Sequence, residues 1–396
     1  MEMKTKIPKY VLRAFELLRS HDISAYLVGG CVRDIMLGHK VHDWDIAAGA
    51  PPDEIAAAFE GFRLILDGLK HGTVGVMIDG QKLEVTAFRG EGGYSDGRHP
   101  DSVFFVPDIE DDLKRRDFTV NAMALPVEPD GYVRPEQIFD PLGGMADLRA
   151  KQIRTAGNPV TRFSEDGLRV MRALRFSCRL GFEIEAETAE AVLSCRHMLN
   201  RISRERVAEE FYKILVCPAP RKILTEYIEV FTSAIGLKPA NTDKIDLSDA
   251  DFITRCVILF GDSTEDVLCG LKRSKSEISS GKAISTALTA PHDNTHRCLI
   301  DLGYEDTRRL LNASYALGRL SERDCRKLIS EADELIKEKA PLSEAELGVS
   351  SEELMALGYV GARLGRLRRE LLYAVADGKT GNTRAELTEY INKTEP

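Results

Sequence analysis

Residues 25–48 read AYLVGGCVRDIMLGHKVHDWDIAA, and this stretch holds several local patterns in close succession. The apolar run 25–28 predicts a strand, the pair Gly29-Gly30 a turn, and residues 32–37 a short helix. A further strand is expected over residues 44–47. Strand, glycine turn, helix and strand in one short segment predict a compact head that combines a small β-sheet with helices.

The second predicted strand carries two acids, Asp43 and Asp45. Side chains alternate faces along a strand, so carboxylates two residues apart project from the same face. Paired oxygen ligands suit Mg²⁺, and two such ions can assist phosphoryl chemistry. A third carboxylate is expected on a neighbouring strand, and Glu84 is the candidate. Two alternatives stay open: solvated turn or cap aspartates, and an edge-strand surface charge at Glu84.

The glycine turn is a candidate anion site. Gly30 opens a backbone that an anion can approach, and Arg33 lies one turn into the following helix, within reach of a phosphate. The alternative is plain turn chemistry. Because the glycine spacing is not GxGxxG, a nicotinamide-dependent oxidoreductase is disfavoured.

Cations gather in the segment 112–124, where Lys114, Arg115 and Arg116 precede Asp117. They are either phosphate clamps or a solvated face with a cap, and a helix of small residues is expected to follow. A triphosphate with its metal ions would need such positive charge nearby.

A helix is expected from Ser164 to about Arg179, with Gly181 as its stop. At helical spacing Asp166, Arg169 and Arg172 share one side, with Arg175 at its edge. Arginines stacked at three-residue steps repel one another unless an anion or acids face them. The alternative is a surface helix with several salt bridges.

The remaining sequence patterns predict how the chain is organised into strands, helices and domains. Strands are expected over 73–78 and 83–88, joined by an Asp79-Gly80 hairpin. After Arg154 the strand patterns stop and helical periodicity takes over, with a polar interruption near 274–282. The fold class expected is an α+β head with a small mixed sheet, followed by an all-α remainder. Boundaries are expected at 1–155, 156–220, 221–340 and 341–396.

Composition limits the classes of partner and compartment. The 396 residues carry a net charge of −9, which excludes a uniformly cationic protein that coats nucleic acid but allows local basic patches. The eight cysteines form no CxxC pair, so reduced, mostly buried thiols are expected and a zinc site is not. Without an apolar run of transmembrane length or a signal peptide, the sequence predicts a cytoplasmic protein.

These motifs, in this order, resemble the tRNA nucleotidyltransferase (CCA-adding) and bacterial poly(A) polymerase family, within the nucleotidyltransferase superfamily of DNA polymerase β. The resemblance is strong over residues 1–215 and weaker beyond. It implies a polymerase-β-like head followed by helical neck, body and tail. It also implies site residues: Asp43 and Asp45 for two Mg²⁺ with Glu84 as third catalytic carboxylate, Gly30, Arg33 and Arg116 for the triphosphate, and Asp166, Arg169, Arg172 and Arg175 for the nucleotide pocket.

The resemblance implies attack of an RNA 3′-hydroxyl on the α-phosphate of CTP or ATP, with release of pyrophosphate and without a nucleic-acid template. Asp166 and Arg169 would read the base edge. The implied partners are the 3′ end and the acceptor/TΨC arm of tRNA, with no membrane and no DNA. A flexible loop over 89–100, which contains Asp96 and Arg98, argues against an enzyme that adds only CC.

Three alternatives remain. Enzymes that add only A keep the same loop, so the sequence does not separate them from full CCA addition. A bacterial poly(A) polymerase usually has a basic C-terminal extension that residues 388–396 do not provide. A catalytically silent RNA-binding protein would have no reason to keep Asp43, Asp45, Arg33 and Asp166 together.

Overall fold

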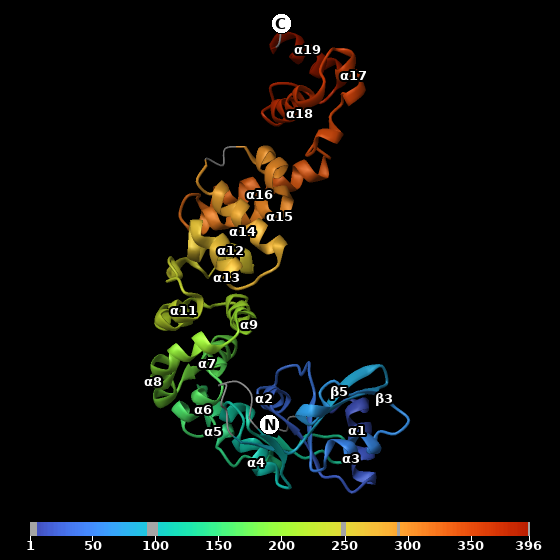
Figure 1. The fold of residues 1–396 in the computed structure, drawn as a ribbon, viewed down its shortest axis with the longest axis vertical. Coiled ribbons are helices and arrows are strands. Elements are labelled where there is room, and N and C mark those ends of the chain that lie inside the picture. The colour runs from blue at the N-terminus through green and yellow to red at the C-terminus, as the bar shows by residue number, and fades with distance from the viewer. Residues whose placement is uncertain (1–5, 93–101, 247–250, 291–293, 395–396) are drawn as a thin grey trace. The chain divides into compact units, whose positions relative to one another are not determined.

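The computed structural model describes residues 6–92, 102–246, 251–290 and 294–394 (Figure 1). The chain divides into two compact units. One unit comprises Met1–Ile214 with Tyr227–Gly236, and the other comprises Leu215–Glu226 with Leu237–Pro396.

A six-stranded mixed sheet forms the head of the first unit, in the order β3-β4-β5-β2-β1-β8. Strands β2 and β5 are parallel, and the other neighbours are antiparallel. All four strands expected from the sequence are present, with end shifts of one or two residues. The strands are β1 (Ala25–Val28), β2 (Asp45–Ala48), β3 (Arg63–Ile65), β4 (Thr73–Ile78), β5 (Gln81–Ala87) and β8 (Ala124–Leu125).

The β4–β5 hairpin turns as predicted. Asp79 and Gly80 have φ of 51° and 75°, between paired Ile78 and Gln81. Three helices contact this sheet or one another: α1 (Lys9–Ser20), α2 (Gly30–Met36) and α3 (Pro52–Ala58). Their buried side chains include Val11, Val32 and Ile55. This packing fixes the position of the β1–α2 turn, on which the site depends.

A separate two-stranded ribbon follows the sheet: β6 (Arg89–Gly92) pairs with β7 (Ser102–Phe105). The segment expected to be a flexible loop therefore begins as a paired strand. Asp96 and Arg98 lie outside the described residues. The next element is α4 (Ile109–Lys114).

The prediction of a small-residue helix after Asp117 is wrong. The chain forms a 3₁₀ turn, η2 (Thr119–Asn121), and then β8. Thr119 N–H donates to the Arg154 carbonyl (3.0 Å), and Ala124 pairs with Phe139 across an isolated bridge. These long-range partners outweigh the local helix propensity of small residues.

The prediction of one continuous helix between Ser164 and Arg179 is wrong. The segment belongs to two helices, α6 (Pro159–Glu165) and α7 (Leu168–Leu180). Asp166 has extended backbone angles (φ −139°, ψ 104°), so it interrupts the helix. The next residue, Gly167, packs closely against Met198, which lies 3.0 Å from where a Cβ would be. Gly181 ends α7 in the left-handed region (φ 66°), as predicted.

The strands also continue beyond Arg154, contrary to expectation, because β10 (Glu183–Ile184) pairs in parallel with β9 (Gln152–Ile153). Strands of two residues leave no periodicity that could be read from sequence. The remaining helices here are α5 (Gly144–Ala150), α8 (Ala186–Ser194), η4 (Cys195–Arg201), α9 (Arg204–Leu215) and α11 (Ile228–Ile235).

The described part of the second unit is helical. The stretch expected to be a polar interruption, 274–282, is instead the start of α14, where Ser274 and Glu277 form a capping box. The last helices bury a core that includes Leu354, Leu371 and Leu387. The α-helices are α10 (Arg221–Glu226), α12 (Phe252–Phe260), α13 (Thr264–Gly270), α14 (Lys275–Ala287), α15 (Thr295–Ala316), α16 (Glu322–Lys337), α17 (Ser351–Ala356), α18 (Gly361–Ala376) and α19 (Arg384–Thr394).

Two expectations about the whole chain can be compared with the structure. All eight cysteines are free thiols and five of them are buried, as predicted. Among the described residues, no helix combines the length and apolar character that a membrane crossing requires.

Candidate active site

The Gly29-Gly30 turn joins β1 to α2 and forms one wall of the site. Gly29 has φ 73° and ψ −134°, which an L side chain rarely adopts. A Cβ there would also lie 3.0 Å from Arg116 Nη1. Glycine is thus required both by the backbone conformation and by the close approach of a guanidinium.

Asp43 and Asp45 flank this turn at the start of β2. Both acids line one cavity, and Trp44 between them is buried. Strand β2 begins at Asp45, so Asp43 lies just before the strand and not in it. Desolvation raises the pKa of Asp45, and the charges of Glu84 and Asp43 raise it further, whereas Arg116 lowers it. A divalent cation would relieve the repulsion among these acids, so the donor set fits Mg²⁺.

Glu84 lies on β5 in register with Asp45 on β2, as the sequence predicts for an acid on a neighbouring strand. Its side chain is half-exposed, pairs with Lys82 (2.7 Å) and lines neither cavity of the site. Within the described ranges, no group of three His, Cys, Asp or Glu side chains is arranged to hold a metal ion. Of the three acids, only Asp43 and Asp45 line a cavity of the site.

Arg33 is buried, and its guanidinium is held on both sides. It donates to Asp34 Oδ1 (2.8 Å) and to Asn121 Oδ1 (2.7 Å). It also lies 5.5 Å from the centroid of the Phe176 ring. These contacts connect α2 of the head to η2 and α7, and they keep a cation beside the glycine turn.

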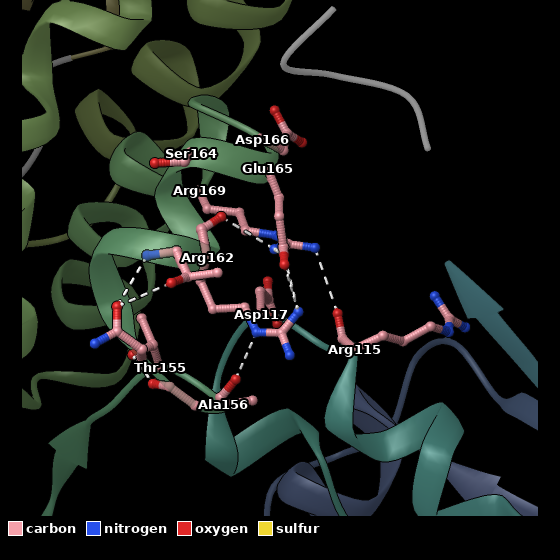
Figure 2. A network of polar contacts seen from close by, with 12 residues as sticks. Arg115, Asp117, Thr155, Ala156, Arg162, Ser164, Glu165, Asp166 and Arg169 are labelled. Carbon is pink, nitrogen blue, oxygen red and sulfur yellow. Dashed lines mark hydrogen bonds and ion pairs between the residues drawn. The ribbon is translucent and has the colours of Figure 1, made fainter. Parts of the chain in front are cut away.

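Asp166 and Arg169 each have protein partners at the α6–α7 break, and Figure 2 shows those of Arg169. Asp166 accepts from Leu168 N–H (3.0 Å) and from Arg206 Nη2 (2.9 Å). Arg169 donates to Glu165 and to the carbonyl of Arg162 (3.1 Å). Its other amino group reaches the carbonyl of Arg115 (3.4 Å), which links α7 to the head.

Two further arginines of α7 face acids. Arg172 Nε donates to Asp117 Oδ2 (2.8 Å), and Arg175 Nε lies 2.6 Å from Glu210 Oε2. Burial raises the pKa of Asp117, but Arg172 outweighs that effect and holds it below its usual value. The repulsion expected along this helix is thus relieved by acids on other elements.

Two neighbouring cavities form the site, and they share four lining residues: Asp45, Arg116, Asp117 and Arg172. One has a volume of about 360 Å³ and includes Asp166 and Arg169; the other, of about 290 Å³, includes Gly30, Arg33, Asp43 and Arg175. The structure therefore brings the predicted glycine, aspartates and arginines of the site together around these two cavities. Glu84 lines neither of them. The predicted Asp96 and Arg98 lie outside the described residues.

Several lining residues were not predicted from the sequence: Asn121, Phe176, Arg179 and Arg206. Arg206 is 40 residues from Asp166 in sequence and only the fold joins them. A weak signal existed, since residues 162–222 carry more arginines and lysines than acids.

Two family descriptions and several known proteins match this chain. Residues 25–154 match the family described as Poly A polymerase head domain, and residues 181–230 match the family described as Probable RNA and SrmB-binding site of polymerase A. The CCA-adding enzyme of Lactobacillus delbrueckii subsp. bulgaricus is 31% identical over 404 residues, which cover 98% of each chain. That of Levilactobacillus brevis is 35% identical over 386 residues, 93% of each chain.

A solved structure agrees with these relatives. The Bacillus stearothermophilus CCA-adding enzyme in complex with CTP superposes with a TM-score of 0.80, at 29% identity and over 98% of each chain. The Thermotoga maritima CCA-adding enzyme complexed with tRNA shares the fold, with a TM-score of 0.67 at 21% identity.

Proposed function

Because the chain belongs to the CCA-adding enzyme family of tRNA nucleotidyltransferases, we propose that it adds C, C and A in turn to the 3′ end of tRNA. The nucleotides would come from CTP and ATP, and no nucleic acid would serve as template. The observation that carries the proposal is the junction of two cavities at Asp45 and Arg116, one with paired acids and the other with Asp166 and Arg169.

In the proposed reaction, the RNA 3′-hydroxyl oxygen forms a bond to the α-phosphorus of the nucleotide. The bond from that phosphorus to the bridging oxygen breaks, and pyrophosphate leaves. Asp43 and Asp45 would hold two Mg²⁺ ions, with Glu84 in register beside Asp45. Such ions, when bound, stabilise negative charge on the attacking and leaving oxygens.

The arginines supply the remaining positive charge. Arg116 lies against Gly29 and lines both cavities, so it can contact a triphosphate beside the Gly30 turn. Arg33 and Arg175 line the same cavity as the paired acids. Their fixed partners pre-orient them, and pre-oriented donors stabilise a transferring phosphoryl group without reorganisation during the reaction.

Base selection is proposed for Asp166 and Arg169. A carboxylate only accepts hydrogen bonds, so it favours the amino group that C and A share and that U lacks. Asp166 accepts a hydrogen bond from Arg206, and Arg169 donates one to Glu165. A base would use the acceptor positions of Asp166 and the donor positions of Arg169 that these contacts leave open, and no RNA or DNA template is needed. Arg172, on the same helix, would complete the wall of the pocket.

We assign the remaining parts by the same family relation. Residues 1–155 would be the catalytic head, 156–220 a neck with the base-reading helix, 221–340 a body and 341–396 a tail. The tail would bind tRNA, and the part of tRNA recognised would be its 3′ end and its acceptor/TΨC arm. The enzyme would act in the cytoplasm on tRNA and not on DNA.

An assay with a tRNA that ends at the discriminator base, with Mg²⁺ and with CTP and ATP separately and together, tests the proposal. Two additions with CTP alone and three with both nucleotides would support it. No use of CTP, but one addition of A to a tRNA ending in CC, would show an A-adding enzyme. Long homopolymer tails with ATP would show a poly(A) polymerase.

The variant Asp43→Ala separates an enzyme from an RNA-binding protein. It should abolish incorporation, since one of the two metal-binding carboxylates is lost, while tRNA binding survives. Unchanged incorporation by this variant would contradict the catalytic assignment.

A further inference from the structure

One carboxylate behind the site holds both cationic side chains that follow α4. Asp112 is 1% exposed. Its Oδ1 accepts from Arg115 Nη2 (2.6 Å) and Nε (3.0 Å), and its Oδ2 accepts from Arg116 Nη2 (3.0 Å) and Nε (3.3 Å). Each oxygen thus receives one guanidinium in a two-pronged contact.

The local chain geometry explains this arrangement. Helix α4 ends at Lys114, so Arg115 and Arg116 follow the last turn, three and four residues after Asp112. At these spacings side chains can reach back to the same point of the preceding turn. Burial raises the pKa of Asp112, but the two guanidiniums outweigh that effect and hold it below its usual value.

The same carboxylate reaches the root of the ribbon. The backbone N–H of Arg89, the first residue of β6, points to Asp112 Oδ1 at 3.4 Å. Arg89 and Arg115 line the cavity that contains Asp166, and Arg116 lines both cavities. Asp112 lines neither cavity, so it can act on a ligand only through its partners.

We propose that Asp112 is a positioning residue: it fixes Arg115 and Arg116, with the β6 root, in the orientation that receives a nucleotide triphosphate. This inference rests on the proposed function for the identity of the ligand. Two guanidiniums side by side repel each other, and a shared buried anion removes that repulsion while it restricts both side chains. Bonds between charged groups are about twice as strong as neutral ones, so a neutral amide would not replace it.

The test measures equilibrium binding of inorganic tripolyphosphate, without tRNA, to the full chain. In Asp112→Asn the amide keeps one acceptor but presents N–H donors to the other guanidinium, which loses its partner. We expect the dissociation constant to rise about tenfold. The control is Asp111→Asn, the same charge change on the same helix, where the side chain is exposed and pairs with Lys114. It should leave the dissociation constant within about twofold of the wild type.

A double-mutant cycle with Arg116→Ala separates positioning from general stability. If Asp112 acts through Arg116, Asp112→Asn should change tripolyphosphate binding far less in the Arg116→Ala background than in the wild type. Additive effects in the cycle, or wild-type binding by a folded Asp112→Asn variant, would overturn the inference. Thermal melting of each variant shows whether it is folded.

Where Asp112→Asn does not fold, Asp112→Glu carries the test. This variant keeps the negative charge and so the attraction to both guanidiniums, but its side chain is one methylene longer and displaces them, so it should fold and still bind tripolyphosphate more weakly. Wild-type binding by Asp112→Glu would overturn the inference. A wild-type protein that binds tripolyphosphate in an Asp112-dependent way but extends no tRNA would refute the proposed function and leave this inference standing.

Discussion

Asp166 is held by two different donors, and this explains how a single carboxylate can serve as a fixed acceptor. The Leu168 N–H donates to Oδ1, and Arg206 on α9 donates to Oδ2 through Nη2 (2.9 Å) and to Oδ1 through Nη1 (3.5 Å). Because Asp166 has left helical geometry, its side chain does not follow the arginine row of α7. If Asp166 reads a base as we propose, this fixation favours binding, since a free rotamer would have to be ordered on binding.

Replacing Asp166 by Asn should therefore weaken selection among bases. The amide offers N–H donors as well as an acceptor, so it can pair with the O4 of U, which a carboxylate disfavours. We expect the preference for CTP over UTP to fall at least about tenfold, because bonds to charged groups carry more than 1 kcal/mol. Single-turnover incorporation with each nucleotide on a tRNA ending at the discriminator base would measure it.

The control for Asp166→Asn is Ser164→Ala. Ser164 is exposed on α6, and its hydroxyl donates to the carbonyl of Val160. This variant should keep the CTP preference. An equal loss of preference in both variants, or none in Asp166→Asn, would contradict the proposed role of the carboxylate.

The sequence pointed to the residues of this site better than to their partners. Asp43 and Asp45 were recognisable as two acids beside a predicted strand, which is a local pattern, and in the structure both line one cavity although Asp43 precedes β2. Arg206 could not be inferred, because it meets Asp166 only after α9 packs in the fold. Glu84 was placed on the correct neighbouring strand, but its pairing with Lys82 depends on side-chain geometry that a strand pattern does not specify.

At the scale of elements, Gly167 at the break between α6 and α7 lies in close contact with Met198 of η4. Gly167 has ordinary helical angles (φ −57°, ψ −21°), so its backbone does not require glycine. The space around Gly167 favours glycine instead, since an added Cβ would lie 3.0 Å from Met198 Cβ and 3.1 Å from the Met198 carbonyl oxygen. A pattern of side-chain periodicity shows no such constraint, which is why one continuous helix was expected.

Gly167→Ala should destabilise the first unit. A methyl group placed against the backbone of η4 forces a shift, and overpacking of this kind costs about 1–3 kcal/mol. Urea unfolding followed by fluorescence or circular dichroism would measure the change. Gly270→Ala is the matched control: it lies at the end of α13, exposed, with nothing within 4 Å of its added Cβ. It should be neutral or slightly stabilising, and equal losses in both variants would rule out the contact with Met198 as the cause.

An ion pair joins the start of α15 to the end of α18. Asp377 accepts from Arg297 Nε (2.5 Å) and Nη2 (2.6 Å), and Asn294 also donates to it (3.2 Å). The hydrogen bonds and charges of Arg297 and Lys379 lower the pKa of Asp377 from 3.8 to about 2. Because the folded-state pKa is depressed, the pair stabilises the fold above the ordinary value and loses its effect as the pH falls towards 2.

Asp377→Asn should therefore reduce stability at pH 7 by roughly 1 kcal/mol, since a partly exposed bidentate pair lies at the upper end for surface ion pairs. The difference from wild type should shrink as the pH falls below about 4. Melting temperatures measured from pH 7 to pH 2.5 would show this. Glu389→Gln, which removes an exposed i,i+4 pair with Lys393, is the control and should have little effect. A difference that persists unchanged at the lowest pH would exclude the ion pair as its cause.

At the scale of the whole molecule, the net charge of −9 is compatible with a tRNA partner only if cations are placed selectively. Helix α18 shows how. Four arginines look alike in its sequence, but Arg368 donates to the carbonyl of Glu344, and Arg369 donates to Asp301 and Tyr373. Arg363 stacks on the ring of Tyr359 (4.8 Å to the centroid), and Arg366 has an exposed side chain. The helix thus uses three arginines in contacts within the protein and presents Arg366 outward.

If the tail contacts tRNA as we propose, Arg366→Ala should weaken tRNA binding a few-fold and reduce the slope of log Kd against log salt by about 1, because one phosphate contact is lost. Turnover at saturating tRNA should stay the same, since α18 contributes no residue to either cavity of the active site. The matched control is Arg369→Ala on the same helix, with the same change in net charge. It should lower the melting temperature and leave the salt slope unchanged, because its guanidinium is already paired with Asp301. Equal reductions of the slope in both variants would show that net charge, and not the outward position of Arg366, governs the affinity for RNA.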